Sequence, residues 1–312
     1  MTALLARQLM TWLFFSMISA TCWAAVQIVD KAIIENEAPS PGHYLFVSCL
    51  PSLPVVALGP IFLDITAISV GGIFLSIVSG LCYFLVTAFL FHALVSLDAS
   101  VTAAALAAVP ALATIAAWPI LGQKPTVLAA IAVLLITAGV FIMSWRGHAT
   151  LSTGKIRRAW FAVLGAALVL AAEYLIDGYV VESAPAPTVF YWTRSGVVTA
   201  TLLFAAIRPR HCLDAIAWLI RRRHIVATLT FGNEVLDMAG VASLITAYSR
   251  GPVGLSTGVA YSNPALVYGA TLAIGFFRPR LIPMGSDHSD WRPRGLGVLL
   301  VVAGVLLATA DQ

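Results

Sequence analysis

Charged residues are scarce in this chain: Asp, Glu, Lys and Arg together make up 10% of its 312 residues, whereas a soluble domain carries about 25%. Hydrophobic residues make up 60%, and the mean hydropathy is +0.93. A chain this long and this apolar cannot bury all of its hydrophobic surface in one water-soluble core. The composition therefore excludes a soluble globular protein and predicts one whose solvent is lipid.

Several motifs of catalysis and cofactor binding are also missing. There is no P-loop, which argues against direct use of ATP, and no HExxH or GxGD pattern that would indicate an intramembrane enzyme. The four cysteines form no CxxC and no metal-ligand spacing, so neither a metal nor a cofactor is expected. The net charge of +4 comes from basic residues between apolar runs, which is typical of membrane proteins and not of nucleic-acid binding.

Long apolar runs, in contrast, are abundant. Crossing a bilayer takes about 20 apolar residues, and lipid offers the backbone no hydrogen-bond partner outside a helix. We therefore predict an all-α integral membrane protein with ten transmembrane helices, near residues 8–31, 43–63, 69–95, 98–121, 126–144, 159–181, 188–207, 224–248, 252–276 and 295–310.

The stretch from Ser100 to Thr126 occurs a second time, 154 positions later, from Gly254 to Arg280. Both copies contain the tripeptide Pro-Ala-Leu, which begins at Pro110 in the first copy and at Pro264 in the second. Both copies also have a basic residue followed by proline near their ends. A proline in the middle of a span removes one backbone hydrogen bond, so Pro110 and Pro264 are predicted hinges.

The first span recurs as well, 147 positions later, so that Asp30 falls on Asp177. Each half of the chain therefore holds five spans, and because five is odd, the second half enters the bilayer from the opposite side. This predicts two inverted-topology repeats related by a pseudo-twofold axis in the membrane plane. The expected units are a first repeat over 1–145, a basic linker over 146–158, and a second repeat over 159–312 with an amphipathic segment over 208–223.

Basic residues are unevenly divided between the two sides of this predicted topology. The loops after spans five, seven and nine hold 13 Lys and Arg residues, and the opposite side holds 3. The positive-inside rule places the 13 in the cytoplasm and both termini outside. A reporter fused after Gln312 is therefore expected to read as periplasmic, and a strong cytoplasmic signal from that fusion would reverse the orientation.

Two five-helix units, a proline in spans four and nine, and a final Ala-Gly-Val helix in each half resemble EamA-like members of the drug/metabolite transporter superfamily. The resemblance implies a transporter whose first four helices in each half line a central cavity, with the fifth and tenth at the periphery. It also implies cytoplasmic termini, which conflicts with the charge count. The acidic residue that such units often carry between the fourth and fifth helices is absent, because Gln123-Lys124 and Phe277-Arg278 stand there.

Ionisable residues inside the spans are the strongest candidates for function, since each costs roughly 2.5–3.5 kcal/mol on insertion scales. Counted from the basic side, Glu173, Arg194, Glu234 and Asp237 lie at depths of about 15 to 22 Å. We expect Glu173 to pair with Arg194, which would leave Glu234 free to exchange protons. The alternative is that these groups only satisfy one another and hold the helices together.

Other residues complete the predicted site for substrate and protons. Asp30 and Asp177 lie near span ends, where either snorkelling to the interface or a gating role would account for them. Polar or aromatic side chains expected to line the cavity are Asn233, Asn263, Trp23, Tyr83 and Tyr261. Gly139 and Gly304, one in the last helix of each half, are expected to mark close helix packing.

These features favour a secondary transporter of a small polar or amphipathic metabolite, an exporter or exchanger in the cytoplasmic (inner) membrane that is coupled to protons. A non-transporting receptor or scaffold is the main alternative, and an intramembrane enzyme is a weaker one. The expected partners are a small molecule, protons and the lipid bilayer, with no nucleic acid. The sequence leaves the substrate and the choice between monomer and homodimer open.

Overall fold

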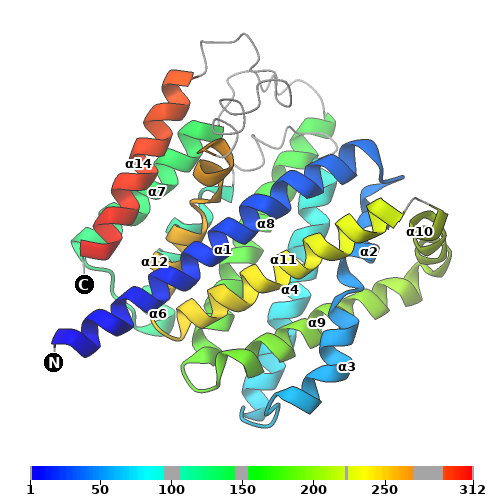
Figure 1. Ribbon diagram of the computed structural model, residues 1–312, viewed down its shortest axis with the longest axis horizontal. Coiled ribbons are helices and arrows are strands. Elements are labelled where there is room, and N and C mark those ends of the chain that lie inside the picture. Colours follow the sequence, from blue (N-terminus) through cyan, green and yellow to red (C-terminus); the bar gives the residue numbers. More distant parts are fainter. Residues whose placement is uncertain (1, 95–105, 145–153, 222–223, 270–290, 311–312) are drawn as a thin grey trace.

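The computed structural model describes residues 2–94, 106–144, 154–221, 224–269 and 291–310, and these residues form helices and no strands (Figure 1). The all-α prediction is therefore confirmed for the described part of the chain. In chain order the helices are α1 (Thr2–Asn36), α2 (Pro41–Cys49), α3 (Ser52–Phe62), α4 (Val70–Leu94), α6 (Val109–Leu121), α7 (Val127–Ser144), α8 (Gly154–Val181), α9 (Ala186–Ile207), α10 (Pro209–Arg221), α11 (His224–Tyr248), α12 (Val253–Ala260) and α14 (Trp291–Ala310).

Within the described residues, five segments are long and apolar enough to cross a membrane, and a sixth is possible if the bent pair α10 and α11 counts as one span. The five are Thr11–Ile34, Pro41–Phe62, Val70–Ala93, Trp160–Val181 and Pro293–Ala310. The chain is thus a multi-pass membrane protein. The predicted stretches 98–105 and 270–276 lie outside the described residues, as does most of the basic linker, so the count of ten spans stays a prediction.

Helix α9 covers the predicted span 188–207 but is not among these apolar segments. It is rich in polar side chains, and Thr188, Thr193, Arg194 and Thr201 are all buried. Neighbouring helices α4, α3 and α11 pack around it. The polar side chains of α9 are therefore kept away from lipid by the neighbouring helices.

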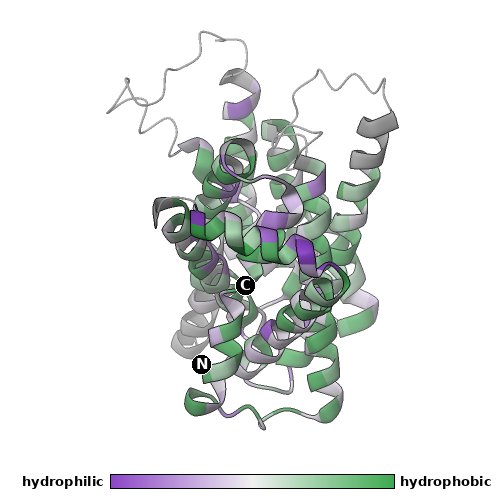
Figure 2. Cartoon of the chain, turned by 90° about the vertical axis from the view of Figure 1, so that its right-hand side faces the viewer, coloured by the Kyte–Doolittle hydropathy of each residue, from purple (hydrophilic) through white to green (hydrophobic). Residues whose placement is uncertain are grey.

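Most residues of the helices are hydrophobic, as the colours of Figure 2 show. Large apolar side chains are exposed, among them Phe62, Val70, Val127, Ile207 and Ile220. The buried residues include carboxylates, an arginine and many hydroxyls. Apolar surface outside and polar groups between the helices is the arrangement that a lipid solvent favours.

The amphipathic segment predicted over 208–223 does form a helix, α10, which lies between α9 and α11. Its buried residues Cys212, Ala215 and Trp218 follow one another at helical spacing. The Trp218 Nε1 donates a hydrogen bond of 3.1 Å to the carbonyl of Glu37, and α11 leaves at an angle of 113° to α10. Its apolar face is thus partly taken up by the protein itself, while the predicted contact with lipid headgroups stays a prediction.

The two repeated prolines lie at helix breaks and not in the middle of continuous helices. Residues 107 and 108 form a turn, after which α6 begins with Pro110 in its first turn. Residues 261 and 262 form a second turn, after which a helix restarts at Asn263, just before Pro264. Proline fits the first turn of a helix because no partner is needed there for its missing N–H group. The expected kinked helix is therefore corrected to a pair of helices that end and restart.

Close packing of α7 against α14 confirms the prediction for the two glycines. A Cβ atom added to Gly139 would lie 2.6 Å from the Gly297 carbonyl oxygen, and one added to Gly304 would lie 2.7 Å from the Ala132 carbonyl oxygen. Only glycine allows backbones to approach this closely. The last helices of the two halves thus form one tightly packed pair, at the left of Figure 1.

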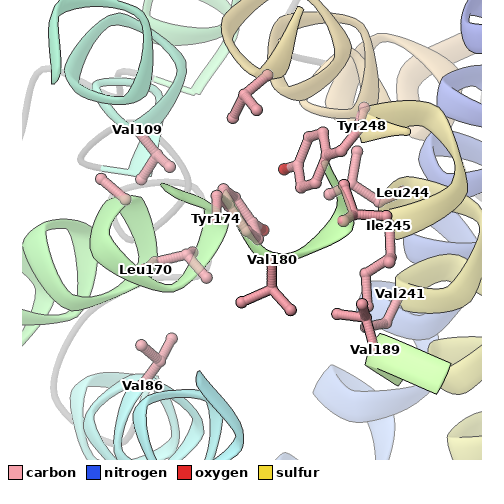
Figure 3. Close-up of a cluster of buried hydrophobic side chains, with 14 of the residues drawn as sticks. Val86, Val109, Leu170, Tyr174, Val180, Val189, Val241, Leu244, Ile245 and Tyr248 are labelled. Carbon is pink, nitrogen blue, oxygen red and sulfur yellow. The ribbon is translucent and has the colours of Figure 1, made fainter. Parts of the chain in front are cut away.

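A large apolar cluster joins α4, α8, α11 and α12 in the middle of the molecule, and Figure 3 shows part of it. Tyr174 of α8 and Tyr248 of α11 bring their rings together there, with centroids 6.1 Å apart. The Tyr248 hydroxyl lies 2.9 Å from the Thr257 Oγ1 on α12. This cluster holds the central helices around the polar site described next.

Candidate functional site

A cavity of about 170 Å³ lies between helices from both halves of the chain. Its lining comes mainly from α1, α2, α4, α8 and α11, and from Tyr261 and Asn263, which follow α12. It includes eight of the side chains predicted from the sequence, Trp23, Asp30, Tyr83, Asn233, Glu234, Asp237, Tyr261 and Asn263. The predicted residues Glu173, Asp177 and Arg194 are buried but do not line it.

Asp237 on α11 is the most connected carboxylate in the cavity wall. Its Oδ1 accepts a hydrogen bond of 3.2 Å from the Trp23 indole on α1, and its Oδ2 accepts one from the Tyr83 hydroxyl on α4. The Arg194 guanidinium on α9 donates to the same Oδ2 at 3.3 Å. One carboxylate therefore ties together four helices that are distant in sequence.

Arg194 is fully buried and lies behind the cavity wall. Its Nη2 is 3.3 Å from Asp237 Oδ2, and its Nη1 is 3.6 Å from Glu234 Oε1. The guanidinium also lies over the rings of Tyr83 and Phe190, at 4.9 and 5.3 Å from their centroids. The planar group thus bridges two carboxylates and also lies near two aromatic rings, a role that suits arginine better than lysine.

The expected ion pair between Glu173 and Arg194 is absent from the described contacts, and this prediction was wrong. Arg194 pairs with the two acids of α11 instead, and Glu173 Oε2 has no hydrogen-bond partner although the side chain is buried. The reason is packing: α8 and α9 follow one another in the chain, yet α9 packs mainly against α4. Equal depth in the membrane does not bring two side chains to the same face.

Asp30, near the end of α1, is held by two neutral groups at the cavity. Its Oδ1 accepts hydrogen bonds of 2.6 Å from the Tyr44 hydroxyl on α2 and of 2.7 Å from the Asn233 amide on α11. Simple snorkelling to the interface does not describe this residue, because its carboxylate is engaged by buried partners. Asp30 therefore belongs to the cavity wall.

Asp177, the residue that the 147-residue shift matches to Asp30, has a similar environment outside the cavity. Its Oδ1 accepts hydrogen bonds of 2.7 Å from Ser79 on α4 and of 3.3 Å from Thr193 on α9. Asp177 is buried among neutral donors, whereas Asp30 is half-buried. Unlike Asp30, Asp177 does not line the cavity.

Three aromatic rings that contact one another line the cavity. Trp23 and Tyr174 are stacked with centroids 6.4 Å apart, and Tyr261 stands edge-on to each at 6.3 Å. Tyr261 lies in the turn that precedes Asn263 and Pro264, so the second helix break places both a ring and an amide at the cavity.

Sequence reasoning missed several residues of this site. Tyr44, Tyr174, Gln27 and Thr87 all contact the cavity or its carboxylates. Gln27 and Thr87 are polar residues within apolar runs, and Tyr174 follows an acidic residue in a span. Those signals could have identified them.

The first half of the chain is similar to a known protein family. Residues 10–145 match the model of the EamA-like transporter family. This first half is an EamA-like transporter unit. The resemblance that the repeated motifs suggested is thereby confirmed for residues 10–145, which are slightly less than half of the chain. The match covers most of α1 and the helices up to α7, which contribute Trp23, Asp30 and Tyr83 to the cavity.

A solved structure described as "Crystal structure of protein" has a similar fold, with a TM-score of 0.67. It is 13% identical in sequence, and the similarity covers 96% of this chain and 96% of that chain. At this identity the likeness concerns the fold alone, and it includes the second half that the family match does not reach. No curated protein sequence matches the chain.

Proposed function

We propose that this EamA-like protein is a secondary transporter that moves a small polar or amphipathic metabolite across the cytoplasmic membrane by alternating access, as an exporter or exchanger coupled to protons. The observation that carries the proposal is the cavity itself. It lies between helices of both halves and contains three carboxylates in a protein whose exterior is apolar. Buried ionisable groups of this kind are expensive in a bilayer and are typical of substrate and proton pathways.

The packing supports two inverted repeats. Helices α4 and α11 begin at Val70 and His224 and end at Leu94 and Tyr248, so both pairs of ends differ by 154 positions. Helix α4 packs against α8, the first helix of the other half, and α11 packs against α1 in the same way. The hydrogen bond between Tyr83 and Asp237 joins two positions that are also 154 apart. Such reciprocal pairing is expected around a pseudo-twofold axis.

The surroundings of Asp30 and Asp177 support alternating access. Each accepts a hydrogen bond from the third helix of the other half, through Asn233 and Ser79, whose numbers differ by 154. Each also accepts one from the helix that follows its own in the chain. Only the Asp30 cluster lines the present cavity. Two equivalent clusters, one open and one packed shut, are what a transporter needs if its halves exchange conformations.

The numbers of acidic and basic groups around Arg194 support proton coupling. Glu234 and Asp237 share one arginine, so a single guanidinium faces two acids. Other titratable groups that face them are Asp30 on α1, Tyr44 on α2 and Tyr83 on α4. One acid is left in excess, and this acid can take up and release a proton as the cavity changes sides.

Replacement of Glu234 by Gln tests this function. The variant is expected to fold, because Arg194 keeps its shorter contact with Asp237, and to bind substrate without the pH dependence of the native protein. The substrate would first be found by a thermal-stability screen across metabolite classes with purified protein. Proton-driven uptake into vesicles is then expected to fall at least tenfold.

The matched control is Glu182→Gln, which removes an exposed carboxylate outside the cavity. It is expected to leave binding and uptake unchanged. If Glu234→Gln still shows native proton-driven uptake, Glu234 is not the coupling group. If no metabolite class is transported by the native protein, the transporter proposal fails in favour of a receptor or scaffold.

A further inference from the structure

The described charged residues that line the cavity are all acidic. Asp30, Glu234 and Asp237 all line it. Among the described residues, no lysine, arginine or histidine contributes to the lining. The positive group nearest to these acids, Arg194, is fully buried behind them and is engaged by both Glu234 and Asp237. With its carboxylates ionised, the group of three acids and one arginine carries an excess of two negative charges.

This distribution discriminates between ligands. With the three acids ionised, a ligand carboxylate would meet three like charges, and Arg194 is fully buried and does not line the cavity. A ligand ammonium would meet three acids and would relieve their mutual repulsion. Burial strengthens both effects, because charges attract and repel more strongly where water is excluded.

The aromatic rings in the cavity wall favour the same class of ligand. Trp23, Tyr174 and Tyr261 lie within 6.4 Å of one another by ring centroids and border the acids. Aromatic faces attract cations, and they offer apolar contact to a hydrocarbon body. A molecule with an ammonium at one end and a flat apolar group at the other would satisfy both the acids and the rings of the lining.

We infer that the substrate is an organic cation: a protonated amine with an apolar or aromatic body, whose ammonium lies among Asp30, Glu234 and Asp237 while its body lies against Trp23, Tyr174 and Tyr261. The inference rests on the proposed transport function and names the substrate class for that site. It excludes anions, and it places zwitterions below amines because their carboxylate finds no accessible counter-charge in the described lining.

Four probes that share a phenyl ring test the inference on the purified full-length protein. Phenethylamine is a cation, phenylalanine a zwitterion, phenylacetate an anion and phenylethanol neutral. Binding would be measured by calorimetry and by the shift in melting temperature in detergent at neutral pH. Phenethylamine is expected to bind at least tenfold more tightly than any of the other three. Equal or tighter binding of phenylalanine or phenylacetate would overturn the inference, and so would a failure of phenethylamine to bind.

Two pairs of variants locate the ligand. Asp30→Asn is expected to weaken the binding of phenethylamine at least tenfold. Asp64→Asn changes an exposed carboxylate that does not line the cavity, and it should leave the affinity for phenethylamine unchanged. Tyr261→Leu is expected to weaken phenethylamine binding to a similar extent. Tyr261→Phe should keep most of the native affinity, because the ring is kept. Equal affinity of the native protein and both Asp30→Asn and Tyr261→Leu would show that the ligand binds elsewhere.

Vesicle uptake separates this inference from the proposed function. Transport of phenylalanine or phenylacetate in preference to phenethylamine would leave the protein a transporter and overturn its assignment to cations. Tight, selective binding of phenethylamine without any uptake would support the cation site and contradict the proposed transport function.

Discussion

Replacing Arg194 by Met is expected to lower the free energy of unfolding by about 3–5 kcal/mol, the range found when one partner of a buried ion pair is removed. Arg194 is fully buried, and its loss would leave Glu234 and Asp237 close together without a positive charge. Desolvated like charges repel strongly, so the cost includes their repulsion as well as the lost hydrogen bond. Thermal and denaturant unfolding in a fixed detergent would measure it.

Glu173→Gln is the informative comparison for this prediction. Glu173 is also buried and acidic, but its Oε2 has no hydrogen-bond partner and it forms no ion pair with Arg194 in the described contacts. The substitution removes a buried charge and is expected to leave stability unchanged or to raise it. A loss from Glu173→Gln as large as that from Arg194→Met would mean that Glu173, and not the acids of α11, is the partner of the arginine.

A rescue experiment would then apportion the effect. Combining Arg194→Met with Glu234→Gln and Asp237→Asn removes all three charges together, which should recover much of the lost stability. Arg194→Lys should lie between the native protein and Arg194→Met, because it keeps the charge and loses the planar fork. A triple variant no more stable than Arg194→Met alone would contradict the electrostatic explanation.

Gly80→Ala is expected to be the other severely destabilising substitution, costing about 3 kcal/mol or more, at the upper end of overpacking effects. An added Cβ would lie 2.0 Å from the carbonyl oxygen of Thr193, 2.7 Å from the Val197 nitrogen and 2.8 Å from the Gly196 Cα. These are backbone atoms of α9, so no rotation of a side chain can make room. The helices α4 and α9 would have to move apart, which would also displace Arg194 from its acids.

Gly232→Ala is the matched control, since Gly232 also lies within a long helix, α11. No heavy atom lies within 4 Å of the Cβ that would be added there. The substitution should therefore stabilise the protein by about 0.5–1 kcal/mol through the better helix propensity of alanine. Melting temperatures of the two variants in one detergent would check both signs, and a tolerated Gly80→Ala would show that the α4 and α9 crossing is looser than described.

The sequence predicted the elements of this protein well, because the apolar runs that specify helices in lipid are a local property. It also identified eight residues of the cavity wall, since polar residues such as Asp30, Asn233 and Asp237 stand out within apolar spans. The pairing of Arg194 could not be predicted in the same way. Depth along a helix can be counted from residue numbers, but the direction in which a side chain points depends on which helices are neighbours.

The two prolines illustrate the same limit. Their repetition marked Pro110 and Pro264 as special, and proline inside a span predicts a disturbance of the helix. Whether the helix bends or stops depends on how the surrounding helices satisfy the freed backbone groups. Here it stops and restarts, which brings Tyr261 to the cavity. That outcome is a property of the packed bundle and not of the local sequence.

The buried arginine also sets a requirement for biogenesis. Helix α9 carries Arg194 at a position that costs roughly 2.5–3.5 kcal/mol to insert into a bilayer, and its partner Asp237 is 43 residues further along the chain. At synthesis rates of about 5–20 residues per second, α11 follows roughly 2 to 9 s later. During that interval α9 can rely only on α4 and the other helices already made. We therefore expect the helices of the second half to enter the bilayer together, with α9 held at the translocon until the acids of α11 arrive.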